Sequence, residues 1–115
     1  MYQVPREQFE ELVDDALDAI PERFAREMTN VVVLVRDYNE DEHTLLGLYE
    51  GVPLTERTAT HTGYLPDTIS IYQDGIERVC SSLDELTREV KTTVWHEVGH
   101  YFGFDDDELH ELGWG

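Results

Sequence analysis

The stretch from Ser82 to Phe102 constrains the fold more than any other part of the chain. Ser82, followed three residues later by Glu85, makes a capping-box pattern that is typical of a helix start. The pattern predicts a long amphipathic helix over about residues 82–102, buried along one stripe. Its apolar residues recur every three or four positions, as one face of a helix requires: Leu83, Leu86, Val90, Val94, Val98 and Tyr101.

Two shorter helical patterns precede this one. Pro5 suits the first turn of a helix, and the apolar residues that follow it have helical spacing until Pro21. Pro21 can itself open a short second helix, in which Phe24 and Met28 lie one turn apart. The first helix would bury Phe9, Val13, Leu17 and Ile20.

Strand patterns occupy the middle of the chain. The run Val31–Val35 is apolar and mostly β-branched, which favours a central strand covered on both faces. Thr44–Glu50 and the alternating segment Asp67–Gln73 predict two further strands. The Asp-Gly dipeptide at positions 74 and 75 is a turn signal, and Ile76–Cys80 after it fits either a fourth strand or a helical turn.

The order of helix, strands and long helix predicts an α+β fold. We expect a small mixed sheet of three to four strands, packed against the N-terminal helix and the long helix. At 115 residues the chain fits one domain over positions 1–115. Gly51–Pro66 is too rich in Gly, Pro and Thr for a regular element, so we expect a loop that borders a functional site.

The charge balance argues against several classes of partner. Asp and Glu number 26 against 8 Lys and Arg, which gives a formal net charge of -18. Such a surface repels phosphate backbones and anionic lipids, so we expect no nucleic-acid and no membrane partner. Cationic partners stay open, although a solvated acidic surface that keeps the protein soluble is the simpler explanation.

The sequence also indicates a compartment. Met1–Phe24 lacks a basic leader with a long apolar run, and no segment approaches the roughly 20 apolar residues of a membrane span. Cys80 is the only cysteine, so no internal disulfide can form. These features favour a soluble protein of the reducing cytoplasm.

A His-Glu-x-x-His pattern stands near the C-terminal end of the predicted long helix. Residues four apart on a helix differ by about 40° in rotation and about 6 Å in rise, so the imidazoles of His96 and His100 can bind one zinc ion. Glu97 stands one position further round, where it can reach a zinc-bound water without binding zinc. Two surface histidines on an ordinary helix are the competing explanation.

Gly103 and Asp106 extend the pattern to His-Glu-x-x-His-x-x-Gly-x-x-Asp. Glycine accepts the positive φ with which helices often end, so the chain can turn back over the metal. Two neutral imidazoles and one carboxylate leave one position of a tetrahedral zinc ion open for the water that hydrolysis needs. The predicted zinc ligands are therefore His96, His100 and Asp106, with Glu97 as the general base.

This extended motif resembles that of the short zincin-like metallopeptidases of bacteria. The resemblance covers nearly the whole chain, because LLGLYEGVPLTER and GYLPDTISIYQ are similar to strand and loop segments of that family. It implies a minimal zincin-like α+β domain and a single-zinc peptidase whose natural substrate is not established. Residue by residue, it implies that His96, His100 and Asp106 bind zinc and that Glu97 is the catalytic carboxylate.

The chain departs from larger zincins with this motif in one respect. Those proteins have a methionine turn after the motif, which forms a hydrophobic floor beneath the zinc. Here Met1 and Met28 are the only methionines, and both precede the motif. Trp114 and Leu112 are the apolar candidates for a floor, and sealing the edge of the core explains them equally well.

The acidic tail allows more than one assignment. Asp105 can cap a short terminal helix, and the spacing favours Asp106 over Asp105 or Asp107 as the zinc ligand. His110, four residues after Asp106, either lies outside the coordination sphere or fills it as a fourth ligand, which would make the metal structural.

Four further side chains have weaker claims. We expect ordinary surface roles for His43 and His61, which lie in predicted loops. Tyr64 and Tyr101 could donate to a developing oxyanion, but the sequence does not distinguish them from packing tyrosines.

The leading hypothesis is hydrolysis of peptide bonds by a zinc-bound water, with Glu97 as general base. Its substrate would be a peptide or a small protein, with cationic groups favoured by the acidic residues beside the motif. The alternative is a non-catalytic binding domain, metal-stabilised or metal-free, that retains the fold. A short domain could also complete its cleft with a second copy, so we consider a homodimer.

Overall fold

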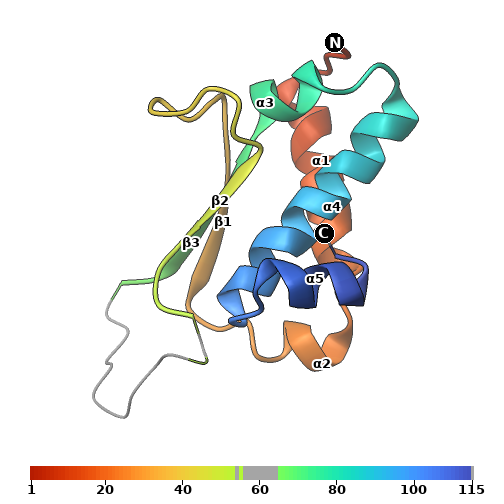
Figure 1. Ribbon diagram of the computed structural model, residues 1–115. Coiled ribbons are helices and arrows are strands. Elements are labelled where there is room, and N and C mark those ends of the chain that lie inside the picture. Colours follow the sequence, from red (N-terminus) through yellow and green to blue (C-terminus); the bar gives the residue numbers. More distant parts are fainter. Residues whose placement is uncertain (54, 56–64, 115) are drawn as a thin grey trace.

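The computed structural model describes residues 1–53, 55 and 65–114. Helices α1 (Arg6–Asp18), α4 (Leu83–Tyr101) and α5 (Asp106–Leu112) lie on one side of a three-stranded sheet, and α4 runs along that sheet (Figure 1). The fold is α+β, as the sequence predicts. The elements in chain order are α1 (Arg6–Asp18), α2 (Glu22–Ala25), β1 (Val31–Arg36), β2 (Gly47–Glu50), β3 (Asp67–Tyr72), α3 (Gln73–Arg78), α4 (Leu83–Tyr101) and α5 (Asp106–Leu112).

The sheet is mixed, with the strand order β1-β3-β2. β3 pairs in parallel with β1 and antiparallel with β2, so that Ile71 lies opposite both Val35 and Gly47. The prediction of β1 as the central strand is wrong, since β3 is central and β1 forms an edge. In the described part of the chain, helices cover only one face of the sheet, and Val32 on β1 is 38% exposed. An apolar run does not specify the order of strands, because pairing depends on distant segments.

α4 confirms the predicted long helix and anchors the core. Its stripe is fully buried at Leu86, Val90 and Val94 and packs with residues of α1 and β3 in one hydrophobic cluster. Ser82 caps the helix by accepting a hydrogen bond from the Glu85 N–H, while the Glu85 carboxylate accepts from Ser81 rather than from Ser82. No helix among the described residues is long and apolar enough to cross a membrane.

The segment after β3 is helical. The predicted turn at positions 74 and 75 is wrong, because both lie inside α3, and α3 rather than a fourth strand continues to Arg78. Gly75 is buried, and a Cβ at this position would stand 2.5 Å from the carbonyl oxygen of Leu45. Glycine at position 75 therefore serves the close packing of α3 against the segment between β1 and β2, and not a turn.

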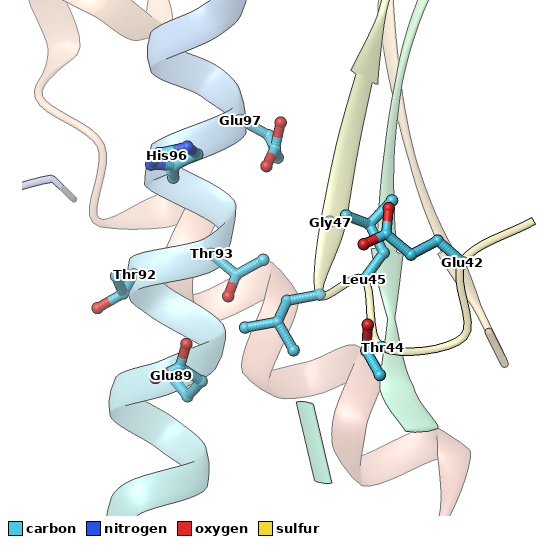
Figure 2. A pocket seen from close by; sticks show the side chains of 10 residues that line it. Glu42, Thr44, Leu45, Gly47, Glu89, Thr92, Thr93, His96 and Glu97 are labelled. Atoms are coloured by element: carbon cyan, nitrogen blue, oxygen red, sulfur yellow. The ribbon is translucent and has the colours of Figure 1, made fainter. Parts of the chain in front are cut away.

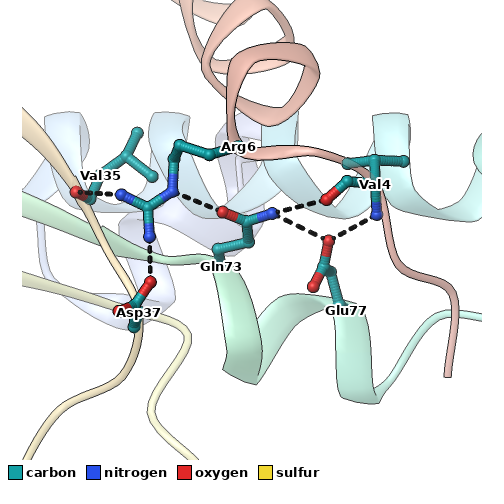
Figure 3. Close-up of polar contacts among 6 residues, drawn as sticks. All are labelled: Val4, Arg6, Val35, Asp37, Gln73 and Glu77. Carbon is teal, nitrogen blue, oxygen red and sulfur yellow. Dashed lines mark hydrogen bonds and ion pairs between the residues drawn. The ribbon is translucent and has the colours of Figure 1, made fainter.

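A polar network ties the N-terminus to α3 (Figure 3). Arg6 donates from Nε to the Gln73 side chain at 2.6 Å, and it also pairs with Asp37. The Gln73 amide donates to the carbonyl of Val4 and to the carboxylate of Glu77, each at 3.0 Å. Glu77 also accepts from the Val4 N–H at 2.9 Å. These five residues form what we call the N-terminal network, and it fixes where α1 begins.

Candidate metal centre

The two histidines of the motif meet on α4. The Nε2 atoms of His96 and His100 lie 3.0 Å apart, and each side chain is 31% exposed. Partial burial lowers the pKa of His96, and the neighbouring His100 lowers it further, whereas Asp106 acts in the opposite direction. The neutral form of His96, which is the form that binds metals, is therefore favoured.

The turn after α4 orients His100. Gly103 has a φ of 88°, which glycine adopts without a steric penalty. The chain reverses there, and the carbonyl oxygen of Phe104 lies 3.2 Å from Nδ1 of His100. A carbonyl can only accept, so Nδ1 carries the proton and the lone pair of Nε2 faces His96 and Asp106. The sequence predicted the Gly103 turn but gave no sign of the Phe104 acceptor, because backbone carbonyls are the same at every residue.

The start of α5 supplies a carboxylate. Asp105 caps α5 through a reciprocal capping box, in which its side chain accepts from the Glu108 N–H at 2.8 Å and its own N–H donates to Glu108 at 3.2 Å. The predicted cap is thus confirmed, and it occupies the Asp105 carboxylate. The next residue, Asp106, has its Oδ1 atom 3.6 Å from Nε2 of each histidine.

One glycine in α4 sets the position of α5. Leu109 of α5 is fully buried, and a Cβ at Gly99 would stand 2.0 Å from its Cδ2 atom. A Cβ at this distance would force the buried Leu109 side chain to shift. Gly99 directly precedes His100, so the packing of α5 against α4 at this contact lies next to the metal-binding group. Sequence analysis missed this pair, since the contact joins two separate helices.

The three donor atoms have the geometry of a metal site. One atom each of His96, His100 and Asp106 lies within 4.8 Å of the others, at separations of 3.0, 3.6 and 3.6 Å. Zinc bonds of about 2.0–2.1 Å in a tetrahedron imply ligand separations of about 3.3 Å. The observed separations bracket that value, and two imidazoles with one carboxylate suit zinc. The group could therefore hold a metal ion of this size.

Glu97 lies in the interface between α4 and β2. It is 8% exposed, and the Tyr49 backbone N–H donates to its carboxylate. A Cβ at Gly47 would stand 3.1 Å from Cγ of Glu97, so the lack of a side chain at position 47 lets β2 close over the carboxylate. Burial raises the pKa of Glu97, although the neighbouring His100 and the Tyr49 hydrogen bond partly oppose the shift.

Hollows flank the histidine pair on two sides. One, of about 380 Å³, begins at His96 and Glu97 and runs between α4 and the segment that precedes β2 (Figure 2). The other, of about 310 Å³, is lined by His100, Pro53 and Thr55. The start of the predicted loop over residues 51–66 therefore borders the site, while its positions 54 and 56–64 lie outside the described residues.

Three tail residues that the sequence singled out lie apart from the metal-binding group. His110 is exposed on α5 and does not join the group found among the described residues. Leu112 is also exposed, whereas Trp114 packs edge-on against Phe24 and Trp95, with ring centroids 5.2 and 5.1 Å away. Trp114 thus seals the edge of the core, which is one of the two roles that the sequence allowed, the other being a floor beneath the zinc.

Tyr101 and His43 do not reach the two histidines of the motif. Tyr101 is fully buried, and its hydroxyl donates to the carbonyl of Thr29 at 2.8 Å, so it is a packing residue. His43 is exposed and contacts the ring of Tyr38. His61 and Tyr64 lie outside the described residues.

Comparison with known proteins bears on this geometry. No curated protein matches the chain. Among solved structures, a conserved hypothetical protein from Thermo thermophilus has a similar fold, with a TM-score of 0.59 and 25% sequence identity over 95% of this chain and 97% of that chain. The zincin-like metallopeptidase family matches residues 28–114, which include both histidines, Glu97 and Asp106. The chain therefore belongs to the zincin-like metallopeptidase family.

Proposed function

We propose that the protein is a zinc-dependent metallopeptidase, in which His96, His100 and Asp106 bind zinc and Glu97 is the general base. The observation that carries the proposal is the triangle of donor atoms, with sides of 3.0, 3.6 and 3.6 Å. A buried carboxylate stands next to the triangle in sequence and in space. Membership of the zincin-like metallopeptidase family supports hydrolytic chemistry at this place.

The division of roles follows from the surroundings of each side chain. A bound zinc ion supplies Lewis acidity, which polarises a carbonyl and lowers the pKa of a coordinated water to about 7. Glu97 accepts a proton from the attacking water and returns it to the leaving amine. The Phe104 carbonyl keeps the His100 ring in one orientation throughout.

The shape of the site supports an extended peptide as the substrate. Within residues 1–53, 55 and 65–114, β2 pairs with a strand on the β3 side alone, so a peptide that adds as a further strand would lie along its other edge. A peptide lying across the histidine pair would enter both hollows. The net charge of -18 favours cationic peptides or small proteins and disfavours nucleic acids and anionic membranes.

The central experiment replaces Glu97 with Gln. We expect Glu97→Gln to retain one zinc ion per chain by metal analysis, because Glu97 is not a ligand. Hydrolysis of a peptide library, followed by mass spectrometry, should fall by about 10²–10⁴-fold. Glu111→Gln, which changes an exposed carboxylate on α5, is the matched control and should keep full activity.

Two outcomes would contradict the proposal in different ways. Unchanged cleavage by Glu97→Gln would show that another group is the base. A zinc-loaded wild-type protein that cleaves no peptide would favour the alternative, a binding domain that retains the fold without catalysis.

The proposal includes a cytoplasmic location and a homodimeric assembly. Cys80 is buried and free, which suits the reducing cytoplasm. A second copy could complete the open cleft, and analytical ultracentrifugation of the zinc-loaded protein tests this homodimer.

A further inference from the structure

The backbone of Tyr49 connects the sheet to Glu97. Tyr72 donates its backbone N–H to the carbonyl oxygen of Leu46 at 2.9 Å, so these two residues form a hydrogen-bonded pair of the antiparallel β2–β3 ladder. Such pairs alternate along an antiparallel ladder, and the backbone groups of Tyr49 therefore point away from β3. The Tyr49 N–H lies outside the ladder, and it donates instead to the carboxylate of Glu97.

This hydrogen bond makes the orientation of the Glu97 carboxylate depend on β2. Glu97 projects from α4 towards β2, and a Cβ at Gly47 would stand 3.3 Å from its Oε2 atom (Figure 2). β2 has only 4 residues and, in the described part of the chain, pairs with β3 alone. A displacement of this short strand would move the donor that holds the carboxylate.

The side chain of Tyr49 holds β2 in place. Its hydroxyl donates to Oδ2 of Asp67, the first residue of β3, at 2.7 Å. Asp67 is only 6% exposed, and a Cβ at Gly51 would stand 2.4 Å from its Cγ atom, so the chain that leaves β2 packs directly on this carboxylate. The Tyr49 ring also packs edge-on against Tyr101 of α4, with ring centroids 6.1 Å apart. One side chain thus joins β2 to both β3 and α4.

Direct contact with a substrate is the competing role for Tyr49. Its side chain lines the hollow beside His100. The hydroxyl proton, however, is engaged by the Asp67 carboxylate, and hydrogen bonds to an ionised acceptor are stronger than those between neutral groups. This arrangement favours a role in positioning over a role in substrate binding.

We infer that Tyr49 and Asp67 are positioning residues for the general base. The bond between phenol and carboxylate fixes β2, and the Tyr49 N–H then holds the Glu97 carboxylate beside the metal-binding group. The inference rests on the proposed peptidase function for the role of Glu97 as the base. We call the hydrogen bonds that link Asp67, Tyr49 and Glu97 the base-positioning chain.

A pair of Tyr→Phe variants tests the inference. Tyr49→Phe keeps the ring but removes the bond to Asp67, so kcat of the zinc-loaded protein should fall by about tenfold at unchanged KM. Tyr72→Phe is the matched control, because the Tyr72 hydroxyl accepts from Asn39 at 2.9 Å and lies at the opposite end of β3 from Asp67. It should keep both kinetic constants. Both variants lose one hydrogen bond, so general destabilisation does not explain a fall in kcat confined to Tyr49→Phe.

Variants of Asp67 test the other end of the same bond. Asp67→Asn keeps an acceptor oxygen for the phenol and should retain most of kcat. Asp67→Ala should lower kcat about as far as Tyr49→Phe does. The double variant Tyr49→Phe/Asp67→Ala should be no slower than either single variant, because both changes break one bond.

Hydrogen exchange of the Tyr49 amide gives a readout that does not depend on catalysis. Because this N–H lies outside the ladder, its protection depends on Glu97, and Glu97→Ala should accelerate its exchange by about tenfold or more. Asp67→Ala should accelerate it severalfold, and Tyr72→Phe should leave it unchanged. NMR of the zinc-free protein measures all three rates.

The outcomes separate this inference from the proposed function. If peptides are cleaved but Tyr49→Phe and Tyr72→Phe lower kcat equally, or if Tyr49→Phe raises KM at unchanged kcat, the positioning role is overturned and the peptidase stands. If the wild-type protein cleaves no peptide, the peptidase proposal fails, and the exchange of the Tyr49 amide decides the base-positioning chain. Acceleration in both Glu97→Ala and Asp67→Ala would support it, and the lack of a response in either variant would overturn it.

Discussion

Two polar clusters, at opposite ends of the helical layer, are built in different ways (Figures 1 and 3). In the N-terminal network, the Glu77 carboxylate accepts from the Val4 N–H and the Gln73 amide, so its buried charge is satisfied within the chain. In the metal-binding group, Nε2 of His96 and His100 and Oδ1 of Asp106 converge on one point. The first arrangement saturates its groups and stabilises the fold, while the second directs its donors at a ligand from outside.

The largest effect should come from removing a donor of the metal-binding group. Asp106→Ala should lower zinc affinity by more than the roughly 10–100-fold that a supporting hydrogen-bond partner contributes. Its side chain is 82% exposed, so unfolding of the metal-free protein in urea should hardly change. Competition with a chromophoric chelator measures the affinity, and Asp107→Ala is the matched control. Equal affinities of the two variants would remove Asp106 from the site.

The N-terminal network should show the opposite response. Glu77→Ala leaves the Val4 N–H and the Gln73 amide without their acceptor, so the free energy of unfolding should fall by about 2–3 kcal/mol. Glu77→Gln keeps one acceptor oxygen and should cost less. Zinc affinity should be unchanged in both variants, as measured by the same chelator competition. A loss of zinc affinity in Glu77→Ala would show that the two clusters are coupled.

One substitution should affect both stability and metal binding. Gly99→Ala places a Cβ against Leu109, so overpacking should cost about 1–3 kcal/mol, even though alanine favours helices. Displacement of α5 should also weaken zinc binding, because Asp106 moves with it. Adding Leu109→Ala should restore part of the zinc affinity, which a double-mutant cycle measures. Strictly additive effects on affinity would contradict the proposed role of this contact.

The smallest effect should come from the cap of α5. Asp105→Ala removes the acceptor for the Glu108 N–H, and its cost in unfolding free energy should be about 1 kcal/mol. Zinc affinity should fall only severalfold, because Asp106 remains in place. Asp105→Asn, which keeps a capping oxygen, should retain both properties. A loss of affinity as large as that of Asp106→Ala would mean that the two residues share the role of ligand.

The parts predicted from sequence are those that local chemistry determines. α4 was predicted because its hydrophobic periodicity and its Ser82 cap both depend only on residues that are close in sequence. The convergence of His96, His100 and Asp106 was predicted because a helical turn, a glycine and a cap suffice to bring them together.

The parts that escaped prediction depend on contacts between distant segments. The central place of β3 requires both of its partners, which the apolar run of β1 does not reveal. The sequence suggested that Gly75 is a turn residue. In the structure, the lack of a side chain at this position leaves room for the Leu45 carbonyl. Gly47 gave no signal either, since its importance arises only where β2 approaches α4.

The short sequence distance between the donors has a consequence for the dynamics of the tail. Because His96 and Asp106 are separated by few residues, a cation that bridges them closes a small loop at low entropic cost. The bound ion would then hold α5 against α4. Exchange of the amide hydrogens of α5 with solvent should therefore slow when the ion binds. Exchange in β1 and α1 should stay the same, so that metal occupancy is reported by the last helix alone.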